Sequence, residues 1–134
     1  MRTEASPPVL PKNFLRPCVL LLLRERPDHG YSLLERLRPL GLAGDDPGGL
    51  YRALRALERE GLVRSAWQTS EAGPDRRIYE LTRAGGEHLH RRARGLAATR
   101  ALLDAFLGRY EEFVALRAKP GSAAGRVAGA AEQG

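Results

Sequence analysis

Residues 46–82 constrain the fold more than any other part of this 134-residue sequence. Asp46 stands where a helix N-cap belongs and Pro47 at the first helical position. Both residue types are favoured there, because the first N–H groups of a helix have no partner within it. Gly61 is placed to end the same helix. The apolar residues between them recur at i, i+4 and i+7, the period of one buried helix face, and they are Leu50, Leu54 and Leu57.

Two segments with the alternation of β-strands follow this helix. They cover residues 62–69 and 77–81, and residues 70–76 between them contain the turn-forming sequence Ala-Gly-Pro-Asp. The pattern predicts a two-stranded hairpin. Trp67 and Tyr79 fall on its two strands, where we expect them to pack the hairpin onto the domain; stacking of a ligand is the alternative.

Two further helices are expected before this segment. Residues 15–26 are almost wholly apolar at their centre, which is typical of a helix buried in the middle of a domain. A second helix is expected over residues 31–37, after the turn-forming sequence Asp28-His29-Gly30. Three prolines disfavour a helix in residues 1–13, which we expect to form an extended arm.

A long helix is expected from Thr82, a favourable N-cap residue, to about residue 119. Such a helix would extend about 50 Å, more than a small domain needs for its own core. Its apolar residues repeat every seven positions, and a strict heptad usually seeks a partner helix. The predicted dimer interface consists of Leu89, Leu96, Leu103, Phe106, Leu107, Tyr110 and Phe113. An aromatic effector pocket is the alternative role for the three aromatic residues.

Three helices followed by a hairpin predict a winged helix-turn-helix domain over residues 14–81. The expected fold class is therefore mainly α with a small β-hairpin. A dimerisation helix over residues 82–119 follows the domain. Residues 120–134 are rich in Ala and Gly and are expected to be disordered.

The charge balance favours a polyanionic partner. Lys and Arg together number 22 against 16 Asp and Glu, which gives a net charge of +6. Nucleic acid is the first expectation and an acidic membrane surface the second. Arginine greatly outnumbers lysine, and a GC-rich coding sequence would produce the same bias. The positions of the arginines therefore have to decide their role.

Arginines fall on the solvent side of the helix that follows Asp46, and again in the hairpin. A guanidinium on the helix can pair with guanine or clamp a phosphate, and the helix N-terminus itself attracts phosphate. Arginines at the expected hairpin tip suit contact with the DNA backbone or entry into a narrow minor groove. The predicted DNA-binding residues are Gly49, Tyr51, Arg52, Arg55, Arg76 and Arg77. The alternative is a solvated helix face and a turn that merely stays soluble.

The sequence contains no pattern typical of an enzyme, a cofactor site or a metal site. Cys18 is the single cysteine, so it forms no intramolecular disulfide, which fits a reducing cytosol. His88 and His90 are two residues apart on an expected helix and would point in different directions, a poor metal pair. His29 precedes a helix, where a capping or packing role is commoner than a switch. No apolar stretch is long enough to span a bilayer, and a soluble cytoplasmic protein is expected.

Several motifs occur together and in order. They are His29-Gly30-Tyr31, residues 49–54, residues 57–63, Gly73-Pro74, residues 77–79 and residues 81–85. In this arrangement the chain resembles the PadR family of bacterial transcriptional regulators over about residues 14–90. Residues 11–15 and 67–69 also resemble the subgroup of poly-β-hydroxybutyrate-responsive repressors.

The resemblance implies a homodimer joined through C-terminal helices, usually a repressor that releases DNA when it binds a small effector. It places the DNA contacts at Tyr51, Arg52, Arg55, Arg76 and Arg77. Two copies of the third helix would then enter successive major grooves of a palindromic operator in double-stranded DNA. Some shorter members sandwich flat drugs between tryptophans of the C-terminal helix, and this helix has none. Two alternatives are a protein-interaction winged helix that never touches DNA and a ligand sensor or carrier.

Overall fold

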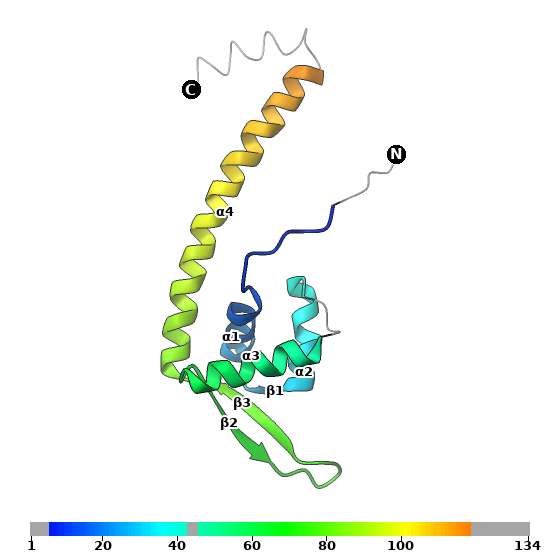
Figure 1. Ribbon diagram of the computed structural model, residues 1–134, viewed down its shortest axis with the longest axis vertical. Coiled ribbons are helices and arrows are strands. Elements are labelled where there is room, and N and C mark those ends of the chain that lie inside the picture. Colours follow the sequence, from blue (N-terminus) through cyan, green and yellow to red (C-terminus); the bar gives the residue numbers. More distant parts are fainter. Residues whose placement is uncertain (1–5, 43–45, 119–134) are drawn as a thin grey trace. The chain divides into compact units, whose positions relative to one another are not determined.

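The computed structural model describes residues 6–42 and 46–118 of the chain. Residues 1–93 form one compact unit and residues 94–134 another. The expected fold class is confirmed: the chain is mainly helical, with a small antiparallel sheet after the third helix (Figure 1). The elements in order are α1 (Leu15–Glu25), β1 (Asp28–His29), α2 (Gly30–Leu37), the 3-10 helix η1 (Arg38–Leu40), α3 (Pro47–Arg59), β2 (Val63–Gln68), β3 (Arg76–Leu81) and α4 (Arg83–Ala118).

Parts of the expected arm and tail fall outside this range. Residues 6–11 belong to no helix or strand, as expected for an arm. Residues 1–5 of the arm and the whole predicted tail, 120–134, lie outside the described residues. None of the helices in the described part of the chain is long and apolar enough to cross a membrane.

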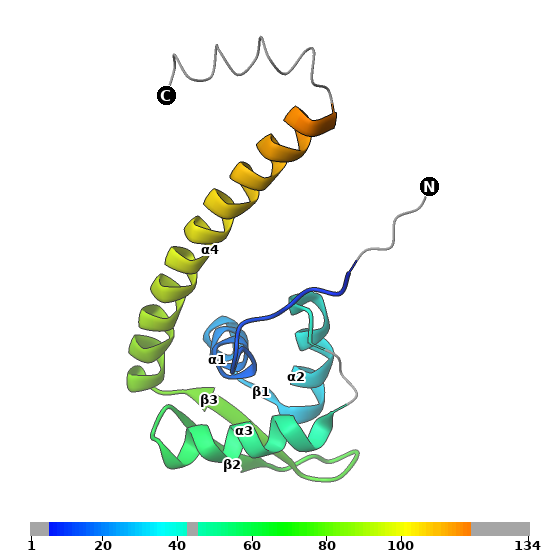
Figure 2. The ribbon, with the colours of Figure 1, turned by 45° about the horizontal axis from the view of Figure 1, so that its top comes forward.

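α1 lies at the centre of the first unit, where it contacts α2, α3 and β3 (Figure 2). Its apolar middle is buried on several sides, as its sequence predicts. The predicted leucine face of α3 is also buried against it. Burial of these side chains is the main stabilising contribution to the unit, and the most completely buried are Val19, Leu20, Leu33, Leu37, Leu50, Leu54, Leu57 and Val63.

The predicted ends of α3 are confirmed by their hydrogen bonds. The Asp46 carboxylate accepts a hydrogen bond from the Gly49 N–H at 3.1 Å, which is the expected N-cap. At the other end Gly61 has a φ of +80°, a left-handed conformation that favours glycine. The Leu62 N–H then donates to the Leu57 carbonyl at 2.9 Å. These caps set where the helix starts and where the hairpin begins.

The expected two-stranded hairpin is part of a three-stranded sheet. β1 pairs antiparallel with β3, placing Asp28 opposite Tyr79 and His29 opposite Ile78, and the strand order is β1-β3-β2. The sequence analysis treated Asp28-His29-Gly30 as a turn and missed β1. A strand of two residues is too short to show an alternating pattern.

A buried carboxylate joins β1 to the helices around it. Asp28 is 8% exposed. It accepts hydrogen bonds from the Ser32 hydroxyl at 2.6 Å and from Arg36 at 2.8 Å. The second guanidinium nitrogen of Arg36 donates to the carbonyl of Leu22 in α1 at 2.9 Å. Burial raises the pKa of the Asp28 carboxyl, but these hydrogen bonds and the Arg36 charge outweigh it and hold the pKa below its ordinary value.

The start of α4 is fixed to the winged-helix unit. The Thr82 hydroxyl accepts from the Gly85 N–H at 3.0 Å and donates to the Gly61 carbonyl at 2.7 Å, which confirms Thr82 as the N-cap residue. A Cβ on Gly85 would collide with the carbonyl oxygen of Leu62. Leu89 is half-buried against the core of its own chain. This contact accounts for Leu89 without a partner helix.

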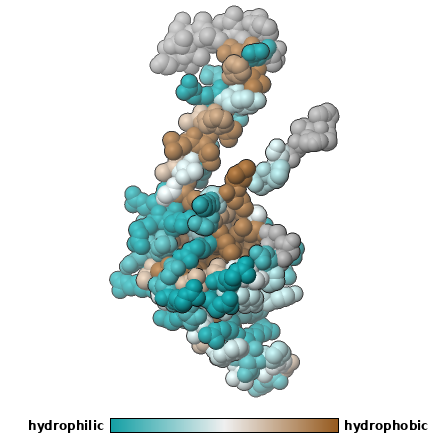
Figure 3. Space-filling view, viewed as in Figure 1, coloured by the Kyte–Doolittle hydropathy of each residue, from teal (hydrophilic) through white to brown (hydrophobic). Residues whose placement is uncertain are grey.

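The second unit carries a face of exposed apolar side chains on α4. They include Leu103 at 55% exposure, Phe106 at 65% and Tyr110 at 55%. Figure 3 shows hydrophobic side chains along this part of α4. Phe106, Tyr110 and Phe113 line an open depression of about 530 Å³. The apolar face, as the term is used below, consists of Leu102, Leu103, Phe106, Leu107, Tyr110, Phe113 and Val114.

Candidate nucleic-acid interface

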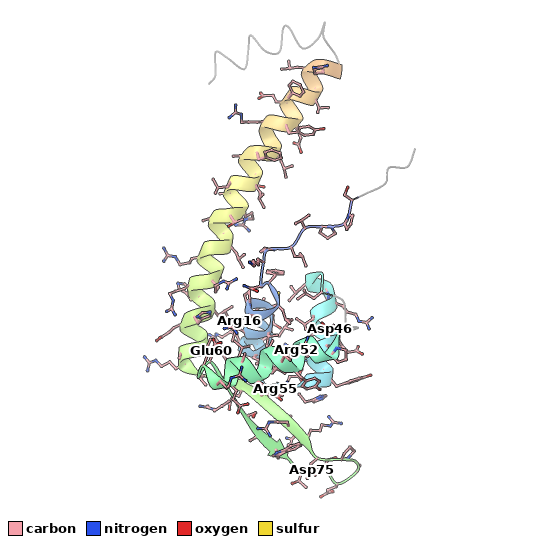
Figure 4. All side chains as sticks on the ribbon, in the orientation of Figure 1. Arg16, Asp46, Arg52, Arg55, Glu60 and Asp75 are labelled. Carbon is pink, nitrogen blue, oxygen red and sulfur yellow. The ribbon has the colours of Figure 1, made fainter. Side chains whose placement is uncertain are left out.

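The polar side of α3 presents the two helix arginines that the sequence singles out. Arg52 and Arg55 are both exposed, opposite the buried leucines (Figure 4). A Cβ on Gly48 would lie 3.1 Å from a guanidinium nitrogen of Arg52, so Arg52 folds back over the first turn. A Cβ on Gly49 would collide with the Asp46 carboxylate that caps the helix. Glycine at this position therefore serves the N-cap.

Tyr51 joins the first turn of α3 to the N-terminus of α2. Its ring is half-buried, and a Cβ on Gly30 would lie 2.6 Å from a ring carbon. Only a glycine lets the ring come this close. The Tyr51 hydroxyl consequently lies at the start of α2, where backbone N–H groups favour an anion.

The two wing arginines do different things, although they are adjacent. The sequence analysis placed Arg76 and Arg77 at the hairpin tip, and the structure places them in β3, beyond the turn. Successive side chains of a strand point to opposite faces. Arg77 donates from Nε to the Ser65 hydroxyl at 2.9 Å. Arg76 instead lies with a guanidinium nitrogen 3.1 Å from His29 Nε2.

His29 has the capping role that its position predicts. Its Nδ1 accepts a hydrogen bond from the Ser32 N–H at 3.4 Å at the start of α2. A neutral imidazole has one acceptor nitrogen. His29 therefore accepts from either Ser32 or Arg76 in a given tautomer, and Arg76 is held only weakly where it lies.

The expectation for the two hairpin aromatics is half right. Tyr79 is 5% exposed and packs the hairpin onto the body, as predicted, and burial raises the pKa of its hydroxyl. Trp67 is 66% exposed, so the expectation that it packs onto the body is wrong. It lies across the sheet from Arg77, at a point of the hairpin that the helices do not cover. Tyr31, at the start of α2, is likewise 67% exposed.

These side chains border one open groove of about 490 Å³ between the start of α2, α3 and the wing. The groove brings together Tyr51, Arg76 and Arg77 of the predicted site. It does not include Gly49, Arg52 or Arg55 on α3. It adds residues that the sequence analysis did not assign to DNA, namely His29, Tyr31 and Trp67. Their side-chain types gave a signal, but only the fold shows that they share a surface.

Other chemistry finds little support in the described residues. Cys18 is buried at 3% exposure, and burial raises the pKa of its thiol to about 11, so the thiol is unreactive. Within residues 6–42 and 46–118, no group of three His, Cys, Asp or Glu side chains is placed to hold a metal ion.

Comparison with protein families decides the broad assignment. Residues 19–91 match the family described as "Transcriptional regulator PadR-like family", which is more than half of the chain. The chain belongs to the PadR-like family of transcriptional regulators. The PadR-like match spans the elements that form the groove and the start of α4. No curated protein matches this PadR-like chain.

Solved structures of PadR proteins have the same fold. A PadR family regulator from Eggerthella lenta is 32% identical, with a TM-score of 0.55 over 71% of this chain and 79% of the other. A PadR-like regulator from Bacillus cereus is 25% identical, with a TM-score of 0.65 over 72% of this chain and 93% of the other. Bacillus subtilis PadR, solved in complex with operator DNA, is 23% identical, with a TM-score of 0.53 over 60% of this chain. The present PadR-like chain covers 46% of that longer protein.

Proposed function

We propose that this PadR-like protein is a sequence-specific DNA-binding repressor that acts as a homodimer in the cytoplasm and is released by a small effector. The observation that carries the proposal is the exposed arginine face of α3 beside the groove of aromatic and cationic side chains. Arg52 and Arg55 read the major groove, and Tyr51 and Arg76 hold the backbone. Gly49 shapes the α3 N-terminus, and Arg77 belongs to the wing contact. The Bacillus subtilis PadR protein of the same fold was solved with operator DNA.

The apolar face of α4 supports the homodimer. Its exposed aromatic and aliphatic side chains form a continuous strip that water solvates poorly, and such strips mark interaction sites. A second copy of the same strip covers it in the manner of a coiled coil. The proposed interface extends from Leu96 to Val114. The corresponding domain organisation is an arm (1–13), a winged helix-turn-helix domain (14–81), a dimerisation helix (82–119) and a tail (120–134).

The effector belongs to the same face. The open depression beside Phe106, Tyr110 and Phe113 offers aromatic walls to a flat molecule. An effector bound there would change the spacing of the two reading units without touching DNA. The C-terminal helix contains no tryptophan, so the walls would be phenylalanine and tyrosine.

A competition experiment tests the proposal against its alternatives. Labelled duplex from the region upstream of the protein's own gene is competed with the same unlabelled duplex or with random-sequence duplex of equal length. A specific regulator is displaced far more effectively by its own region, typically by a factor of about a thousand or more. Equal competition would indicate a protein-interaction or ligand-sensing module instead.

A further inference from the structure

Trp67 lies where packing of the core does not explain it. Side chains two residues apart lie on one face of a strand, so Val63, Ser65 and Trp67 share a face of β2. That face is buried at Val63, which is 1% exposed, and open at Trp67, which is 66% exposed. The face that packs on the body therefore continues past the body and ends in an exposed indole.

A chain of contacts from α3 holds this indole. Glu58 of α3 accepts the Ser65 hydroxyl proton, with oxygen distances of 2.8 and 3.1 Å. Ser65 in turn accepts from Arg77 Nε at 2.9 Å. The Arg77 guanidinium carbon lies 5.3 Å from the centroid of the Trp67 ring, a cation–π distance. The indole is thus positioned relative to α3 and does not hang freely from the wing.

The indole also borders the groove described above. Tyr31 and Tyr51 from the helices and Arg76 from the wing line the same groove. Aromatic side chains contact sugars and bases, and cations contact phosphates. A wall that combines both suits a nucleic acid strand.

We propose that Trp67 contacts DNA directly, its indole packing against deoxyribose and base edges of the minor groove next to the site read by α3. Apolar wedges of this kind are used at minor-groove contacts. Arg77 is a positioning residue that acts through Trp67, and Arg76 carries the phosphate contact of the wing. The inference rests on the proposed DNA-binding function and assigns two residues of that same site.

Intrinsic fluorescence tests the contact, because Trp67 is the single tryptophan of the chain. Unlabelled duplex from the protein's own upstream region is added to the full-length protein, and quenching of Trp67 by acrylamide is measured with and without DNA. Binding itself is followed separately by the anisotropy of the same duplex carrying fluorescein. The proposal expects Trp67 to be protected from acrylamide over the range in which anisotropy rises.

Variants separate contact from positioning. Trp67→Ala should weaken binding about tenfold, the size expected for one lost aromatic stacking contact, with the salt dependence unchanged. Arg77→Ala should weaken binding by a similar factor, also with unchanged salt dependence, and the double variant should be no weaker than either single one. Gln68→Ala is the matched control, since Gln68 is an exposed neighbour on the opposite face of β2 and should leave affinity unchanged.

The outcomes distinguish this inference from the function on which it rests. Absence of specific binding in the anisotropy measurement overturns both. Specific binding with Trp67 still open to acrylamide overturns the indole contact alone. A salt slope reduced by about 0.9 for each Arg77 removed, with losses that add to those of Trp67→Ala, would make Arg77 a phosphate contact and overturn its positioning role.

Discussion

Replacement of Asp28 should destabilise the winged-helix unit more than any surface substitution. Its carboxylate accepts from the His29 N–H at 2.9 Å, from the Ser32 hydroxyl and from Arg36, with both partners of the ion pair mostly buried. Removing one partner of a buried pair typically costs about 3–5 kcal/mol. Arg36 keeps Glu25 and the Leu22 carbonyl as acceptors, so we expect the lower end of that range for Asp28→Ala.

Asp28→Asn keeps the shape and one acceptor oxygen but loses the charge. We expect it to lower the free energy of unfolding by about 2 kcal/mol, since hydrogen bonds to charged groups contribute about 1.5–3 kcal/mol each. Glu25→Gln is the matched control: Glu25 also pairs with Arg36 but is 54% exposed, and exposed pairs contribute about 0–1 kcal/mol. Urea unfolding followed by circular dichroism, at one protein concentration, gives all three values. Indistinguishable unfolding of Asp28→Asn and wild type would refute the reasoning.

The same carboxylate predicts the direction of a pH effect. The pKa of Asp28 is lowered in the folded protein. Its contribution to stability is therefore fully present above the pKa of an unfolded aspartate, about 3.9, and is lost as pH falls through the lower folded value. The loss of stability between neutral pH and acid should be smaller in Asp28→Asn than in wild type. An identical loss in both proteins would contradict the assignment.

Three further predictions concern the interface and the dimer. Leu103→Asp should give monomers in light scattering, because each dimer would bury two unpaired carboxylates; a persistent dimer would rule out the α4 interface. Arg76→Ala should lower the salt slope of DNA binding by about one to two units for a dimer, and a titration with an unchanged slope would remove the phosphate contact. Gly30→Ala should force the Tyr51 ring away, costing about 1–3 kcal/mol of stability and weakening DNA binding; normal values of both would show that the close approach is unimportant.

Sequence patterns sufficed for the elements that have strong local signals. The cap at Asp46, the leucine face of α3, the stop at Gly61 and the cap at Thr82 are all local interactions, and each is found where predicted. β1 was missed because its two residues are a strand only through their pairing with β3, a long-range interaction.

The candidate site was less predictable, because it depends on where the fold carries each side chain. Alternation along the hairpin suggested that Trp67 is buried, but nothing in the local pattern shows where the body ends. Adjacency in sequence suggested that Arg76 and Arg77 act together, and the pleat of β3 separates them. The groove itself joins α2, α3 and the wing, so no single stretch of sequence contains it.

Hydroxyl-radical footprinting on the protein's own upstream region tests the central claim most directly. A homodimer that reads DNA with two copies of α3 should protect two symmetric half-sites whose centres are about 10 base pairs, or a small multiple of that, apart. Arg52→Ala/Arg55→Ala should abolish this pattern, and a matched substitution at the exposed Arg83 on α4 should leave it intact. A uniform weak protection, or a footprint that survives loss of both α3 arginines, would contradict the account.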